Sequence, residues 1–228
     1  MSHQGLIIAI DGPAGAGKST VAKHLATHFG LLNLETGAMY RAFALKALTQ
    51  GIDLDDATAL EQLAATTTIT LEPTPNGNRV LLDGEDVTSR IRDAEVTQAA
   101  SRVSVHPAIR SWMVNLQRNL GKNGGVVMEG RDIGTVVFPD ADLKFFLDAS
   151  PEARTQRRYE QAPAVAINSA AIAKELRERD DRDRNRAQSP LRPAPDAIII
   201  DSTFLGLEEV LNKIESIVKT ELHRTPNR

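Results

Sequence analysis

The 228-residue chain contains no cysteine, and none of its apolar runs approaches the ~18 residues of a membrane-spanning helix. The first absence excludes disulfide bonds, thiolate metal ligands and a cysteine nucleophile, and it fits a reducing compartment. The second predicts a protein with no membrane partner. Residues 1–4 lead directly into an apolar run, which leaves no room for a signal peptide, so we expect a cytoplasmic location.

The chain also lacks an excess of positive charge. It has 27 Lys and Arg against 30 Asp and Glu, a formal net charge of −3. This balance argues against a surface built as a whole to bind nucleic acid, so any basic site must be a local cluster. The hydrophobic share of 41% and the charged share of 25% are ordinary for a globular protein, and the length predicts one domain that carries insertions.

The most informative stretch is residues 6–19. Its first half, 6–11, is a short apolar run that predicts a strand buried on both faces, and its second half, 12–19, fits the pattern GxxxxGK[ST]. Backbone N–H groups approach phosphates closely only where side chains are small. Lys18 would place a positive charge at the β- and γ-phosphates in an exposed cradle, and Ser19 would offer its hydroxyl to Mg²⁺. We predict a nucleotide site; the alternative is a glycine-rich turn without a ligand.

The rest of the chain alternates between short apolar runs and helical patterns. Further strands are predicted at about 31–35, 125–129, 143–148 and 197–201. Helices are predicted at about 17–29, 38–48, 56–65, 93–104, 107–120 and 207–218, and from Ser150 and Pro151 onward. Gly30 is placed to end the first helix. This alternation predicts an α/β fold whose parallel sheet is flanked by helices.

One segment, from about 66 to 92, interrupts this pattern. Its apolar residues follow period 2 at 68–72 and 79–83, a turn is predicted at 75–78, and 85–87 predicts a third short strand. Strands that pair locally as a meander cannot belong to a parallel layer with helical crossovers. We therefore predict a small antiparallel flap inserted into the α/β body.

Two charged segments are candidate site elements. Arg131 and Asp132 directly follow a predicted core strand, at the edge where α/β sheets bind ligands; the alternative is an ion pair that fixes a loop. The second segment, 175–186, predicts either a solvated helix with pairs such as Asp180–Arg184, or a face shared by Arg179, Asp183 and Arg186. Charge pattern alone leaves both interpretations open. Arg41 by itself is interpreted as a solvated surface residue, and Ser101 and Arg110, which carry no local motif, are interpreted as structural.

Four segments, taken in order, resemble the cytidylate (CMP) kinase family of P-loop nucleoside monophosphate kinases over essentially the whole chain. They are Ile10–Ser19, Thr36–Arg41, Gly130–Ala141 and Arg179–Arg186. The resemblance implies a P-loop kinase fold with a five-stranded parallel sheet, a small antiparallel sheet in the monophosphate-binding flap and a helical lid. The implied parts are a core at about 1–62, 93–153 and 187–228, a flap at about 63–92 and a lid at about 154–186.

The resemblance also implies phosphorylation of CMP, and of dCMP, by ATP with Mg²⁺, in a monomer. The ATP-binding residues would be Gly12, Pro13, Ala14, Gly15, Ala16, Gly17, Lys18, Ser19, Thr20 and Arg157, with Mg²⁺ at Ser19. The acceptor-binding residues would be Thr36, Arg41, Ser101, Arg110, Arg131, Asp132, Arg179, Asp183 and Arg186. The residues acting directly in catalysis would be Lys18, Arg131 and Arg186.

Individual roles follow from the same resemblance. Arg41, Arg131 and Arg186 would hold the phosphates. Ser101, Arg110 and Asp132 would read the cytosine, which replaces the structural interpretation of Ser101 and Arg110. Arg179 and Asp183 would contact the ribose, and Thr36 would line the monophosphate pocket. Glu35 and the segment 161–173 depart from the family pattern, and the departure at 161–173 leaves the lid contacts of Arg154 and Arg157 open.

Three other functions compete with this one. Another small-molecule P-loop kinase, acting on UMP, AMP or shikimate, would differ in the acceptor flap. A P-loop GTPase switch would need a guanine-reading NKxD sequence, which the chain lacks. A nucleic-acid module that uses the arginine-rich segment would bind oligonucleotides with steep salt dependence, and the net charge argues against it.

Overall fold

The computed structural model describes residues 5–74, 77–160 and 168–224. The strands are β1 (Ile7–Asp11), β2 (Leu32–Glu35), β3 (Ile69–Thr74), β4 (Gly77–Leu82), β5 (Glu85–Asp86), β6 (Val126–Gly130), β7 (Leu143–Asp148) and β8 (Ile198–Asp201). The helices are α1 (Lys18–Phe29), α2 (Thr36–Thr49), α3 (Ala57–Ala65), α4 (Ala94–Val103), α5 (Pro107–Gly121), α6 (Pro151–Glu160), α7 (Ser169–Asn185) and α8 (Leu207–Arg224), with short helical turns η1 (Arg90–Arg92) and η2 (Ile133–Val137).

The main sheet has five parallel strands, as predicted, and their order is β2-β6-β1-β7-β8. The central strand β1 pairs with β6 on one side and β7 on the other, with Ile8 opposite Val127 and Leu143. These strands read as continuous apolar runs because helices cover both faces of the sheet. Their carboxyl ends therefore meet at one edge, where the loops after β1, β2 and β6 lie together.

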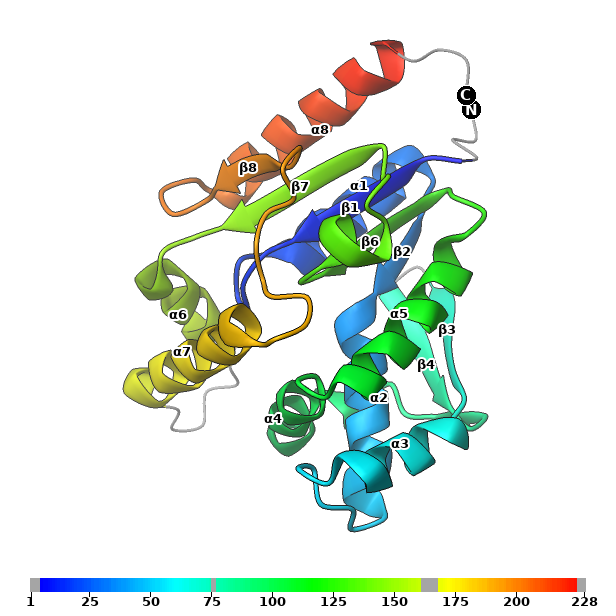
Figure 1. The fold of residues 1–228 in the computed structure, drawn as a ribbon. Helices are drawn as coiled ribbons and strands as arrows, with labels where there is room; N and C mark the ends of the chain where they lie inside the picture. Colours follow the sequence, from blue (N-terminus) through cyan, green and yellow to red (C-terminus); the bar gives the residue numbers. More distant parts are fainter. Residues whose placement is uncertain (1–4, 75–76, 161–167, 225–228) are drawn as a thin grey trace.

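The two faces of the sheet carry separate apolar cores. Ile8 and Ile10 pack with residues of α1 and α8 on one face, whereas Ala9 between them packs with residues of α2 and α5 on the other. This alternation follows from the period of two along a strand. In Figure 1, α8 lies over β7 and β8 at one side of the sheet, and α2 and α5 lie at the opposite side.

The predicted flap is confirmed as the antiparallel sheet β3-β4-β5. Of its predicted turn, residues 75–76 lie outside the described residues. Leu71 and Val80 are buried and join the core that contains α2, and the Asn78 side-chain amide donates to the Asn33 carbonyl at 2.7 Å. The insertion is thus packed against the α/β body.

Helix ends mostly follow the predicted signals. Gly30 ends α1 in the left-handed conformation, and the Ser150 hydroxyl accepts a bond from the Ala153 N–H ahead of α6. The predicted face of α7 needs correction, because α7 ends at Asn185 and Arg186 is extended beyond it. Beyond the helix, the Arg186 guanidinium donates to the Ser189 carbonyl, so Arg186 does not lie on a face of α7.

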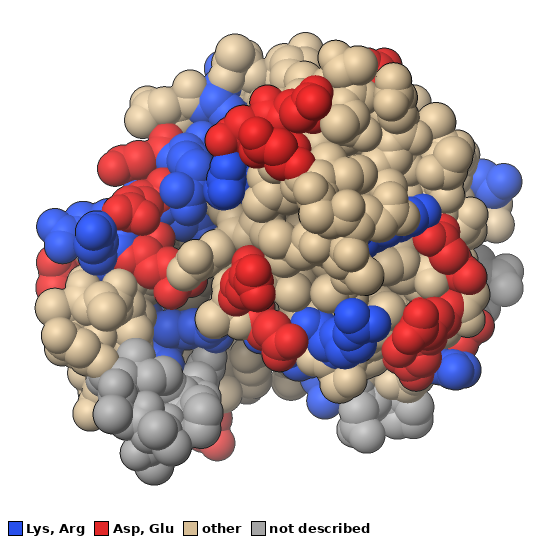
Figure 2. Space-filling view, turned by 90° about the horizontal axis from the view of Figure 1, so that it is seen from below, with Lys and Arg blue, Asp and Glu red and all other residues tan. Residues whose placement is uncertain are grey.

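The described residues contain no helix long and apolar enough to cross a membrane. Seen from below, Lys and Arg side chains gather over the side of the molecule where α6 and α7 lie, and Asp and Glu stand among them (Figure 2). This gathering of basic residues is therefore interspersed with acidic ones, and other Lys and Arg side chains are scattered over the same face.

Candidate active site

A cleft opens at the carboxyl ends of β1, β2 and β6, with α7 across from the glycine-rich loop. The predicted site residues that line it are Ala14, Gly15, Gly17, Lys18, Ser19, Thr20, Thr36, Arg41, Ser101, Arg110, Arg131, Asp132, Arg157, Arg179, Asp183 and Arg186. The other three predicted residues, Gly12, Pro13 and Ala16, are buried parts of the same loop. Segments up to about 170 residues apart in the chain thus share one cavity.

The loop 12–17 requires glycine at two places that shape it. Gly12 has φ +147°, and a Cβ there would lie 2.0 Å from the Leu147 carbonyl oxygen of β7. Gly17 has φ +98° and forms the N-cap of α1, so the backbone turns in the left-handed region as the helix begins. Gly12 thus lets the loop lie directly against β7, and the turn at Gly17 directs the α1 N-terminus, with the N–H groups of its first turn, into the cleft.

Lys18 is more buried than an open phosphate cradle suggests. Only 6% of the residue is exposed, and its Nζ donates to the Pro13 carbonyl at 2.7 Å across the loop. Burial, reinforced by the nearby Arg131 guanidinium, lowers the pKa of Lys18 to about 7, although Glu129 opposes the shift. An anion bound beside the amine would raise this pKa again and favour the charged form.

Two buried acids at the strand ends were not predicted as site residues. Asp11 accepts the Ile133 and Gly134 N–H groups, each at 2.8 Å, so it ties the end of β1 to η2. Burial raises the pKa of Asp11 to about 6. Glu129 lines the cleft at the end of β6, where burial raises its pKa and one carboxyl oxygen has no hydrogen-bond partner among the described residues. The position of Glu129 at the end of a predicted parallel strand was the sequence signal that could have identified it as a site residue.

Thr36 and Arg41 come from the start of α2. The Thr36 hydroxyl donates to the Glu129 carbonyl at 2.7 Å, which joins α2 to β6. The Arg41 guanidinium pairs with Glu35, and its Nε has no hydrogen-bond partner in the described part of the chain. Arg41 therefore keeps donor capacity inside the cleft.

Asp132 and Asp183 form ion pairs with three arginines of the cleft. Arg110 and Asp132 form an ion pair, both almost fully buried. Arg186 lies 3.9 Å from Asp132 and 3.5 Å from Asp183. Arg131 donates through Nε to Asp183 at 2.8 Å. The Arg131 and Asp132 side chains thus pair with other segments rather than with each other as a loop-fixing pair.

This network changes the acidity of its members. Burial opposes ionisation of Asp183, but Arg131, Arg179 and Arg186 together bring its pKa below the usual value. Burial lowers the pKa of Arg186, and burial with the nearby Arg131 lowers the pKa of Arg179 to about 10. Within the described residues, Arg110 Nε and Arg186 Nη2 are buried without hydrogen-bond partners. The cleft therefore holds surplus donors suited to anionic oxygens.

The two lid arginines left open by the sequence make defined contacts. Arg154 is buried, donates to the Ala14 carbonyl at 3.0 Å and pairs with Asp180 at 2.7 Å. Asp180 therefore pairs with Arg154 rather than with Arg184 as predicted. Arg154 thereby links α7 to the glycine-rich loop. Arg157 donates to the Ser202 hydroxyl at 3.0 Å, beyond β8. Of the predicted lid tip, 161–173, residues 161–167 lie outside the described residues.

Ser101 connects α4 to α7 at the cleft. Its hydroxyl accepts a bond from Arg182 Nε at 3.0 Å, although the two residues lie on α4 and α7. Arg182 was not singled out in the sequence, where it is one of several arginines in a charged helix. Only the contact between the two helices distinguishes it.

The sheet order, the glycine loop ending in Lys18 and the arginines facing it define a P-loop kinase fold. The family model for cytidylate kinase matches residues 8–220. The chain is 50% identical to a cytidylate kinase of Solibacter usitatus over 95% of this chain and 94% of that one. It is 53% identical to one of Pelotomaculum thermopropionicum, with 91% and 93% covered. The chain therefore belongs to the cytidylate kinase family and is a nucleoside monophosphate kinase.

Proposed function

We propose that this protein transfers the γ-phosphoryl group of ATP to CMP, and to dCMP, with the cleft residues acting as described below. The observation that carries the proposal is the facing arrangement of the Lys18 loop and the arginine network in one cavity. Family membership supports CMP as the acceptor.

The donor phosphates belong at the loop 12–17 and the α1 N-terminus. Backbone N–H groups and the helix dipole favour negative charge there. The Lys18 amine would exchange its bond to the Pro13 carbonyl for a β- or γ-phosphate oxygen. Phosphate charge beside the amine would raise its lowered pKa again.

The residues beside the loop fit Mg²⁺. Ser19 and Glu129 both line the cleft, and Glu129 has a carboxyl oxygen without a hydrogen-bond partner among the described residues. Oxygen donors of this kind suit Mg²⁺. We propose that Ser19 holds the ion with assistance from Glu129; the ion would neutralise phosphate charge as the transfer proceeds.

In the transfer itself, the bond from the γ-phosphorus to the bridging oxygen of ATP breaks as a CMP phosphate oxygen bonds to that phosphorus. Charge then spreads over the three equatorial oxygens, so catalysis depends on positioning and fixed positive charge. Arg41, Arg131 and Arg186 would supply it together with Lys18. The acceptor oxygen is already anionic at neutral pH, so no strong general base is needed.

Base recognition is assigned to Asp132, Arg110 and Ser101. An ionised carboxylate only accepts and a guanidinium only donates. Asp132 therefore suits the 4-amino group of cytosine, and Arg110 suits its ring acceptors. Uracil presents a carbonyl and an N–H at those positions, so its carbonyl oxygen would face the Asp132 carboxylate without the donor that the cytosine amino group supplies. The existing Arg110–Asp132 ion pair supports this division because it fixes both groups beside one another.

The remaining assignments concern the sugar and the organisation of the chain. Arg179 and Asp183 would contact the ribose. We propose that residues 63–92 and 154–186 act as monophosphate-binding flap and lid, and that lid closure excludes water from the transfer. We also propose that the protein is a monomer and that it has a cytoplasmic location, where ATP and CMP are available.

The test is an acceptor panel of CMP, dCMP, UMP, AMP, GMP and shikimate, assayed for ADP formation and for the phosphorylated product. We expect the highest kcat/KM with CMP, followed by dCMP, and only background ATP hydrolysis without an acceptor. Preference for AMP or shikimate would contradict the base-reading assignment. ATP hydrolysis without transfer would contradict the proposed activity itself.

A further inference from the structure

A second cluster of chemically active side chains lies where α1 packs against α8. His24 and His28 stand one turn apart on α1, and Glu215 reaches them from α8. His24 Nε2 lies 2.9 Å from one Glu215 carboxyl oxygen, and His28 Nε2 lies 3.3 Å from the other. None of the three lines the cleft.

The three donor atoms already have the spacing of a metal site. They all lie within 4.8 Å of one another. Tetrahedral Zn²⁺ with bonds of about 2.0–2.1 Å keeps its ligand atoms about 3.3 Å apart, so small side-chain rotations suffice. Neutral imidazole can carry its proton on Nδ1 and present Nε2 to a metal. Two histidines four residues apart on a helix lie on the same face and can therefore chelate one ion.

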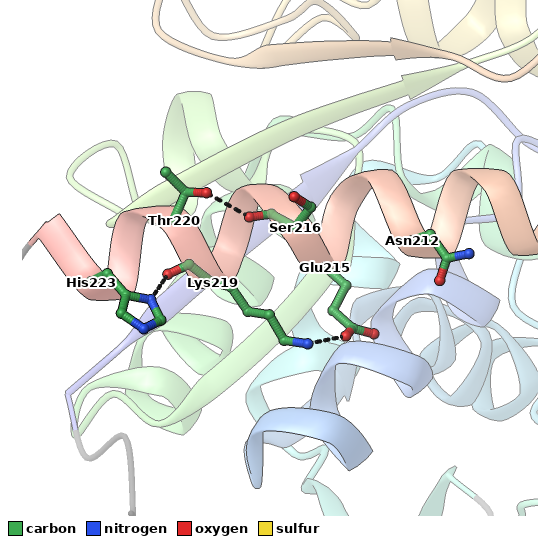
Figure 3. Close-up of a pocket in the computed structure, with 6 residues that line it drawn as sticks. All are labelled: Asn212, Glu215, Ser216, Lys219, Thr220 and His223. Carbon is green, nitrogen blue, oxygen red and sulfur yellow. Dashed lines mark hydrogen bonds and ion pairs between the residues drawn. The ribbon is translucent and has the colours of Figure 1, made fainter.

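The surroundings favour a nitrogen- and oxygen-ligated ion open to solvent. The side chains of His24 and His28 are 31% and 39% exposed, whereas that of Glu215 is 16% exposed. Lys219, one turn along α8, pairs with Glu215, and His223 Nδ1 donates to the Lys219 carbonyl further along the same groove (Figure 3). Lys219 is half exposed, so it can turn into solvent when a cation takes its place.

We propose that His24, His28 and Glu215 form a binding site for a divalent transition-metal ion, of which Zn²⁺ is the probe, with water completing the coordination. Such an ion joins α8 to α1, the helix that begins at Lys18. His24 lies about 9 Å along the helix axis from Lys18, at 1.5 Å per residue. The site is therefore outside the phosphate cradle but holds the helix that forms it.

The experiment is a Zn²⁺ titration of the untagged full chain at pH 7.5 against a chromogenic chelator. We expect one bound Zn²⁺ per chain, with affinity at least tenfold weaker in each of His24→Gln, His28→Gln and Glu215→Gln. Lys219→Met should bind more tightly, because the competing ammonium is removed. Near 100 times Kd, Zn²⁺ should raise Tm by about 5–10 °C in the parent chain and by much less in His24→Gln.

The matched control is His223→Gln, which removes a histidine from α8 outside the cluster. It should bind Zn²⁺ as the parent chain does. Circular dichroism without metal establishes that each variant is folded, and the Lys219→Met result tests the site without removing a ligand. The proposal is overturned if His24→Gln and His28→Gln bind Zn²⁺ like the parent, if His223→Gln loses it equally, or if ATP and CMP displace the ion, which would place it in the cleft.

Discussion

The two sides of the cleft are built in opposite ways. The donor side is one continuous loop, in which glycine conformations and a helix N-terminus present backbone N–H groups, and Lys18 is its single cation. The acceptor side gathers side chains from α2, α4, α5, α7 and the end of β6. There Asp132 and Asp183 hold Arg110, Arg131 and Arg186 in ion pairs, and each of these arginines also donates to a backbone carbonyl.

This difference separates two ways of preparing an anion site. On the donor side the loop backbone is fixed, and burial disfavours the charged form of the Lys18 amine and lowers its pKa to about 7. On the acceptor side Arg41, Arg110, Arg131 and Arg186 are paired with carboxylates, so substrate must share or replace existing pairs. We therefore expect a donor-side substitution of Lys18 to act by removing its charge. An acceptor-side substitution should act by disturbing several paired residues at once.

The largest expected effect is that of Lys18→Ala. Loss of the only lysine in the loop should reduce kcat by ~10³-fold or more, since no other residue there replaces its charge. Burial disfavours the charged amine in the fold, so Tm should not fall. Steady-state kinetics and thermal melts measure both. Lys23→Ala, an exposed change on the same helix, should behave as the parent chain; near-normal turnover in Lys18→Ala would refute the donor-side assignment.

Arg186→Ala should follow, with a loss of ~10³-fold in kcat and a much smaller change in the KM for CMP. A guanidinium that acts on the migrating phosphoryl group behaves like an arginine finger. Arg186→Lys should restore little, since a point charge does not reproduce the planar fork. Arg184→Ala, an exposed change near the end of α7 and two residues before Arg186, is the control. A loss confined to KM would assign Arg186 to ground-state binding.

Asp132→Asn should change which acceptor is used more than it changes ATP binding. Asparagine can both accept and donate, so the preference for CMP over UMP should narrow towards one. The expected change in the ratio of kcat/KM values is about 5- to 150-fold, from a penalty of about 1–3 kcal/mol for an unpaired buried polar group. The exposed Asp140→Asn should leave the ratio unchanged. Equal losses on both acceptors would make Asp132 a positioning residue.

The smallest expected effect is the pH dependence of ATP affinity. The free chain has Lys18 with a pKa of about 7, and bound phosphate should raise it, so binding takes up a proton above pH 7. Between pH 8 and 9, Kd should therefore rise by up to about tenfold. Calorimetry in two buffers of different ionisation enthalpy measures the proton uptake. Lys18→Ala should lack it, and an equal uptake in that variant would assign the proton to another group.

The sequence by itself determined the parts of this protein that depend on neighbouring residues. The strand runs, the glycine loop 12–17, the end of α1 at Gly30 and the period-2 flap follow from local backbone preferences and burial patterns. The motifs also indicated the family, because each preserves a local geometry at a fixed place in the chain.

Only the tertiary structure decided which distant side chains meet. Ser101 is bonded to Arg182, and Arg110 to Asp132, across helices and loops that local sequence does not bring together. It also decided that α7 stops before Arg186, and that Asp11 is buried with a raised pKa. Pairing and desolvation depend on all the atoms packed around a group, so a pattern along the chain predicts the residue types but not their partners.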